Sequence, residues 1–83
     1  MNKELKELKL ANARIGGKYI VVRVDGPALV KRRLLDMGII SGTKLEVVGV
    51  APLGDPLHIK ARGYDLTLRL DEASNIVVRE ISE

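Results

Sequence analysis

The segment DGPALVKRRLLDMGIISGT, residues 25–43, carries the only strong helix signal in the chain, and strand-like segments lie on both sides of it. Val30, Leu34 and Met37 recur at spacings of three and four, which places them on one face of a helix. Leu35 widens this apolar stripe. The pattern predicts one short amphipathic helix in a chain that is otherwise strand-like.

The end of this helix has a signal of its own. Gly38 is expected to adopt the left-handed conformation of a Schellman stop, with Ile39 packing back on Leu34. The next four residues predict a type II turn, in which Gly42 takes the positive φ that the third position requires. We therefore assign structural roles to Leu34, Met37, Gly38 and Gly42.

Five segments alternate apolar and polar residues and are rich in β-branched or leucine side chains, as strands are. They are Tyr19–Val24, Lys44–Val50, Leu57–Ala61, 65–70 and Ile76–Ile81. In a chain of 83 residues, one bent sheet that closes on itself is economical, because closure removes exposed edges. The prediction is a mainly β fold: a small, partly open, five-stranded barrel with the helix inserted after the first strand.

Glycines and short polar segments predict the local breaks in these strands. Gly49 indicates a bulge, and Gly63 indicates a tight hairpin between the third and fourth strands. The segment from Asp71 to Asn75 resembles one helical turn, with Asp71 as its cap and Asn75 in a left-handed exit. Residues 51–56 form a loop that contains two prolines and a glycine.

The chain is predicted to form a single domain over residues 10–83, preceded by a flexible or weakly helical segment over residues 1–9. In that segment Leu5 and Leu8 would share one side, but isolated helices shorter than about 12 residues are marginal in water. The sequence has no Cys, and its start lacks the apolar core of a signal peptide. We expect a soluble, cytoplasmic protein.

The inventory of reactive side chains is small. With one His and no Cys, a single chain cannot assemble the usual tetrahedral zinc site, and His58 beside Asp55 is better explained as an outward strand residue near a loop. A nucleophilic serine needs a base and an orienting partner, and His58 is the only histidine. No phosphate-binding glycine motif occurs. We predict no catalytic residues, no cofactor and no metal ligands.

The formal net charge is +3, and the only local basic cluster is Lys31-Arg32-Arg33. Nucleic-acid-binding proteins usually carry a stronger basic stripe, and two tyrosines are too few for a platform that stacks bases. The cluster is either a solvated helix face, with an arginine paired to Asp36, or a docking surface. We expect no DNA or RNA partner.

Loop 51–56 offers a second candidate contact. Its prolines reduce the entropy that docking would cost, and Leu53 is an apolar anchor at its tip. The candidate partner-binding residues are therefore Arg32, Arg33, Leu53, Gly54 and Asp55.

Two sets of residues also resemble a known family in order and spacing. The first set is Arg33 to Ile39 (RLLDMGI), Gly42-Thr43 and Glu46-Val47; the second is Ala51 to Pro56 (APLGDP), Arg62-Gly63-Tyr64, and Leu66, Leu68 and Arg69. Together they resemble the signature of the FeoA family over about residues 10–80. Residues 1–9 show no part of this pattern.

The resemblance implies an SH3-like barrel with a helical insertion and a role as an accessory protein of bacterial ferrous iron uptake. It implies one partner, the membrane transporter FeoB, through that protein's cytosolic GTP-binding domain, so that membrane contact occurs only through the partner. Transition-metal binding is described for the family as a whole. Two alternatives stay open: a small basic nucleic-acid-binding barrel and a metal-sensing module.

Overall fold

The computed structural model describes residues 6–81, which form one antiparallel sheet of six strands in the order β1-β6-β2-β3-β4-β5. The strands are β1 (Glu7–Lys9), β2 (Lys18–Val24), β3 (Lys44–Val50), β4 (Leu57–Ala61), β5 (Tyr64–Leu68) and β6 (Ile76–Glu80). The helices are η1 (Leu10–Asn12), α1 (Ala28–Asp36) and α2 (Leu70–Ala73). The mainly β prediction with one inserted helix is confirmed, but the sheet has six strands rather than five. Because β1 precedes the predicted first strand, the helix lies between β2 and β3.

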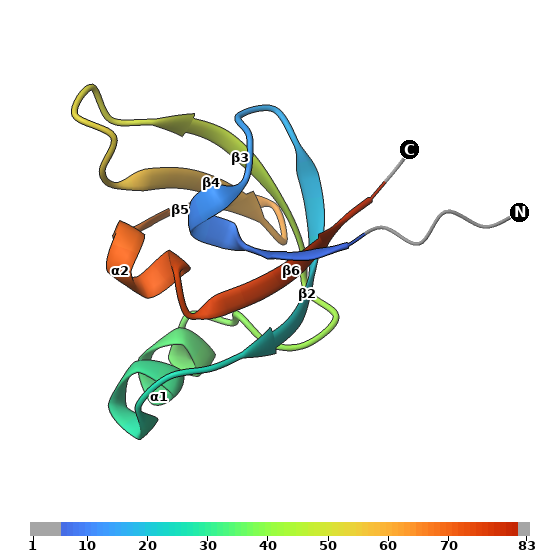
Figure 1. Ribbon diagram of the computed structural model, residues 1–83, viewed down its shortest axis with the longest axis vertical. Coiled ribbons are helices and arrows are strands. Elements are labelled where there is room, and N and C mark those ends of the chain that lie inside the picture. Colours follow the sequence, from blue (N-terminus) through green and yellow to red (C-terminus); the bar gives the residue numbers. More distant parts are fainter. Residues whose placement is uncertain (1–5, 82–83) are drawn as a thin grey trace, which may run out of the picture.

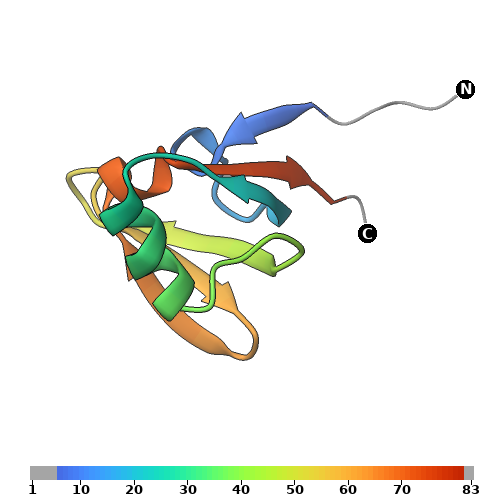
Figure 2. The ribbon, with the colours of Figure 1, turned by 90° about the horizontal axis from the view of Figure 1, so that it is seen from below.

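The sheet folds over on itself. Figure 2 shows β1, β6 and β2 in one half and β3, β4 and β5 in the other. Register shifts occur in β2, between Val21 and Arg23, and in β3, between Val47 and Gly49. Such bulges increase strand bending, and the predicted bulge at Gly49 is confirmed. Helices α1 and α2 and loop 51–56 lie at the end of the molecule away from the two termini (Figure 1).

Alternating side chains of the strands form the core. In β4 the predicted pattern is confirmed, because Leu57, Ile59 and Ala61 are buried while His58 and Lys60 are exposed. The other buried apolar residues are Leu10, Tyr19, Val21, Leu34, Ile39, Leu45, Val47, Leu68, Ala73, Ile76, Val77 and Val78. Within residues 6–81, no helix is long and apolar enough to cross a membrane.

Helix α1 ends as predicted. The Gly38 N–H donates to the Leu35 carbonyl and the Ile39 N–H to the Leu34 carbonyl, both at 2.9 Å. These are the two hydrogen bonds of a Schellman motif, and φ of Gly38 is +84°. Leu34 and Ile39 are buried and Met37 is partly buried. Leu35, however, does not widen the buried stripe, because it is 56% exposed.

The N-terminal segment differs from the prediction. Residues Glu7–Lys9 form strand β1 rather than a helical turn, and they pair with β6 in antiparallel register. Glu7 also accepts a hydrogen bond from Arg23 at 3.1 Å. This bond, with the nearby charge of Asp25, raises the pKa of Arg23 above its usual value. Pairing with an open sheet edge therefore prevails over the weak local helix preference, and Leu5 lies outside the described residues.

Helix α2 also begins and ends differently from the prediction. Its cap residue is Arg69 rather than Asp71, and Glu72 accepts the Arg69 N–H at 3.0 Å. Asn75 does not take a left-handed conformation, since Arg62 is the only non-glycine residue with positive φ in the described chain. The Asn75 side chain instead donates to the Asp71 carbonyl at 3.0 Å. The side-chain acceptor at the start of α2 is therefore Glu72, three residues beyond the cap residue, and not the predicted Asp71.

Candidate partner-binding site

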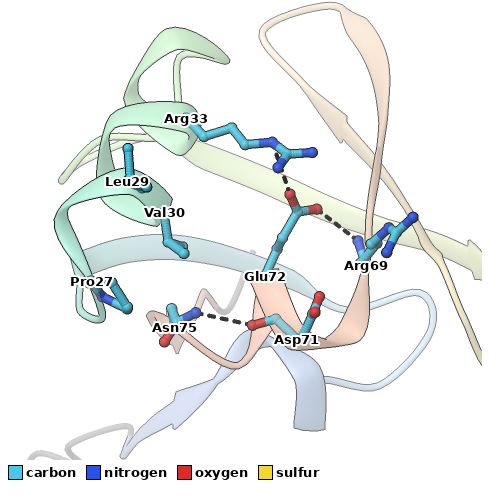
Figure 3. Close-up of a pocket in the computed structure, with 8 residues that line it drawn as sticks. All are labelled: Pro27, Leu29, Val30, Arg33, Arg69, Asp71, Glu72 and Asn75. Atoms are coloured by element: carbon cyan, nitrogen blue, oxygen red, sulfur yellow. Dashed lines mark hydrogen bonds and ion pairs between the residues drawn. The ribbon is translucent and has the colours of Figure 1, made fainter.

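A groove runs between α1 and α2, and we call it the α1–α2 groove. Its first part has a volume of about 510 Å³ and its second part about 470 Å³. The first part is lined by Pro27, Leu29, Val30, Arg33, Arg69, Asp71, Glu72 and Asn75, as Figure 3 shows. The second part is lined by Arg33, Asp55, Pro56, Thr67, Arg69 and Glu72. Because three residues line both parts, the two are continuous.

Glu72 lies at the centre of this groove and joins its two walls. One carboxylate oxygen accepts the Arg69 N–H, and the other lies 3.2 Å from Nε of Arg33 (Figure 3). The Glu72 side chain is only 13% exposed, whereas that of Arg33 is 67% exposed. The ion pair therefore fixes the stem of Arg33 and leaves the end of its guanidinium group in solvent.

The predicted pair between an α1 arginine and Asp36 does not form in the described chain. Arg33 pairs with Glu72 instead, and Asp36 is exposed. Glu72 is already held by a backbone donor, so it offers Arg33 a fixed acceptor at little entropic cost. A solvated side chain such as Asp36 has to be ordered before it can form a pair.

Loop 51–56 is tied to α2 through Asp55. Its carboxylate accepts the Leu70 N–H at 3.0 Å, which satisfies one of the open donors at the start of α2. Within the loop the Gly54 N–H donates to the Ala51 carbonyl at 2.7 Å, and Leu53 at the tip is 97% exposed. The loop is thus internally braced while it presents an apolar side chain to solvent.

The structure brings together some of the predicted contact residues. Arg33 and Asp55 line the same part of the groove. Arg32 is exposed on α1, and Leu53 and Gly54 belong to the loop that ends at Pro56, so these three lie outside the groove lining.

Nine of the eleven lining residues were not among the predicted contact residues, and four of these nine are central to the site. They are Leu29, which is 83% exposed, together with Thr67, Arg69 and Glu72. The spacing of three between Arg69 and Glu72 was the one available signal, because a glutamate at that position can accept the cap N–H. The groove combines two arginines, three carboxylates and exposed apolar side chains, a set suited to binding by ion pairs and apolar contact.

The residues considered for metal binding are dispersed. His58 points outward from β4, and Asp55 is engaged by the Leu70 N–H. Across residues 6–81, no three His, Cys, Asp or Glu side chains are placed to hold one ion.

A folded-over antiparallel sheet with a helix between β2 and β3 defines a small SH3-like domain. The FeoA domain family matches residues 8–80. The chain therefore belongs to the FeoA family.

Individual relatives agree with this assignment. A Porphyromonas gingivalis protein described as a fusion of Fe(2+) transport protein A and the Fe(2+) transporter FeoB is 35% identical over 75 residues. The match covers 90% of this chain but only 9% of that relative. The relative thus holds a domain of this kind and a transporter in one polypeptide.

Solved structures show the same fold. A FeoA-like protein from Clostridium acetobutylicum is 38% identical with a TM-score of 0.87, and the match covers 94% of this chain and 91% of that one. FeoA from Stenotrophomonas maltophilia, solved with zinc and described as a prokaryotic SH3 domain protein, is 28% identical with a TM-score of 0.74. That match covers 86% of this chain and 88% of the other.

Proposed function

We propose that this chain is a cytoplasmic accessory protein of ferrous iron uptake that binds a FeoB-type transporter through its cytosolic GTP-binding domain. The observation that carries the proposal is the relative in which FeoA and FeoB form one polypeptide. Covalent joining keeps the two parts at high effective concentration, as expected for partners that act together. In this proposal the chain is not an enzyme, and it meets the membrane only through the transporter.

The proposed contact surface is the α1–α2 groove with loop 51–56 beside it. Leu53 and Leu29 supply exposed apolar anchors, and large apolar side chains exposed at one end of a small domain favour a protein partner. Arg32 and Arg33 add arginine, which is enriched among residues that dominate binding energy. Asp55 and Gly54 keep Leu53 in a braced loop, so docking orders little new chain.

The test is a calorimetric titration of the transporter's purified GTP-binding domain with this protein and with two leucine variants. Leu53→Ala is expected to weaken binding about tenfold, as loss of an apolar anchor does. Leu35→Ala is the matched control, because Leu35 is also an exposed leucine but belongs neither to the groove lining nor to loop 51–56. Equal affinity of both folded variants would place the interface elsewhere on the domain.

The two alternative functions, nucleic-acid binding and metal sensing, are tested by separate experiments. Binding to duplex or single-stranded oligonucleotides that falls steeply with salt, together with no affinity for the transporter domain, would replace the proposal with a nucleic-acid-binding function. Stoichiometric ferrous ion retained by the monomer in equilibrium dialysis would support a metal-sensing module instead.

A further inference from the structure

Strand β5 has an open edge. It is the last strand of the sheet and is joined to β4 by a two-residue turn, in which Arg62 and Gly63 have φ of +53° and +84°. Two positive φ values define a type I′ hairpin, whose closing pair, Ala61 with Tyr64, exchanges hydrogen bonds. Because hydrogen-bonded and non-bonded pairs alternate in an antiparallel ladder, the backbone groups of Asp65 and Thr67 point away from β4.

These outward groups have no partner in the described chain. No turn, loop or other strand of residues 6–81 forms a hydrogen bond with the backbone of Asp65 or Thr67, and both residues are exposed. The edge therefore presents two N–H donors and two carbonyl acceptors at a spacing of two residues. Only another extended backbone matches that arrangement.

Helix α1 lies alongside this edge. The Tyr64 hydroxyl donates to the Met37 carbonyl at 3.3 Å, and Thr67 lines the same part of the α1–α2 groove as Arg33. The end of α1 is thus linked to the start of β5, and the groove lies beside Thr67 near the other end of the strand. A second copy would have to bring its own α1 into this space, whereas one extended segment carries no helix with it.

We propose that the partner domain docks by adding an extended segment to the β5 edge, with backbone hydrogen bonds to Asp65 and Thr67. This inference rests on the proposed function and specifies how the partner binds. Arg33 approaches Glu72 through Nε, and its side chain stays 67% exposed. Within residues 6–81 the Arg69 side chain forms no ion pair. Because Arg33 and Arg69 line the groove with Thr67, an acidic side chain of the segment fits there. A basic side chain fits beside the carboxylate of Asp65.

Amide hydrogen exchange of the labelled protein tests this directly. The Asp65 and Thr67 amides are expected to exchange rapidly in the free protein and at least about tenfold more slowly when the transporter domain saturates it. Leu66 is the internal control, because its N–H already belongs to the ladder with β4. Unchanged exchange at Asp65 and Thr67 in the saturated protein would overturn edge pairing and leave the proposed function intact.

Two other outcomes also decide the question. If no titration saturates the protein, the proposed function fails and this inference fails with it. If the two amides are already protected in the free protein, in a manner that depends on its concentration, a second copy occupies the edge and the inference is overturned.

A pair of substitutions at one position separates backbone from side chain. Thr67→Pro removes the outward N–H without loss of a ladder hydrogen bond, as proline on an edge strand can. It should weaken partner binding about tenfold. Thr67→Val keeps the N–H and should change affinity less than about twofold. Equal affinities in folded variants would exclude the backbone contact, and the exchange experiment still decides if the proline variant does not fold.

Discussion

Arg33 on α1 and Glu72 on α2 form an ion pair, with 3.2 Å between Nε and Oε2, that joins the two helices at one end of the domain. The same carboxylate accepts the Arg69 N–H. One side chain therefore performs two tasks, a helix cap and an interhelical pair, and substitution can separate them.

Glu72→Gln should reduce the free energy of unfolding by less than about 1 kcal/mol, because the amide still accepts the Arg69 N–H and Arg33 is mostly in solvent. Glu72→Ala removes the acceptor as well and should cost about 1 kcal/mol more. Urea unfolding followed by circular dichroism measures both changes. A glutamine variant as unstable as the alanine variant would show that the ion pair, and not the cap, contributes the larger part.

Leu34→Ala should destabilise the domain by about 2 to 5 kcal/mol, since it creates a cavity at a fully buried site. Leu35→Ala, at the next residue of the same helix, should change stability by less than about 0.5 kcal/mol because that side chain is mostly exposed. Urea midpoints of the two variants give the comparison. Similar midpoints would mean that α1 contacts the core in a different helical phase.

Gly38→Val should cost more than about 1 kcal/mol, because a β-branched residue is strained at a φ of +84°. A Cβ at this position would also lie 3.2 Å from the Tyr64 hydroxyl oxygen. Gly49→Val is the control, since a Cβ there meets no atom within 4 Å and φ is not positive. Thermal unfolding that shifts equally for both variants would contradict a special role for Gly38.

The features that could be predicted from the sequence are those determined within a few residues. The Schellman stop at Gly38 and the hairpin at Gly63 depend on backbone conformations that glycine adopts and most residues avoid. Strand β1 could not be predicted, because its partner β6 lies at the other end of the chain and its own composition slightly favours a helix. Long-range pairing decided the conformation of Glu7–Lys9.

The candidate site likewise has features determined by neighbouring residues and features determined by contacts between distant segments. Exposure of Leu53 followed from its place in a proline-bounded loop, which is local information. The pairing of Arg33 with Glu72 depends on α1 and α2 meeting in space, and nothing close to Arg33 in the chain indicates it. A nearby carboxylate at Asp36 favoured the wrong partner, since spacing along a helix reports neighbours on that helix alone.

The last prediction separates docking from direct action on the nucleotide. The double charge reversal Arg32→Glu/Arg33→Glu should weaken binding to the transporter's GTP-binding domain about tenfold or more. GTP turnover at saturating concentrations of this protein should stay unchanged, because Glu72 holds Arg33 against α2 and a finger arginine must reach the nucleotide.

Lys18→Glu/Lys44→Glu provides the control. It makes the same change in net charge on β2 and β3, outside the groove lining, and should leave affinity nearly intact. A drop in saturating turnover of about a thousandfold for the arginine variant would identify an arginine finger and reject the docking role. Equal loss of affinity in both double variants would mean that overall charge, and not the arginine pair on α1, governs the encounter.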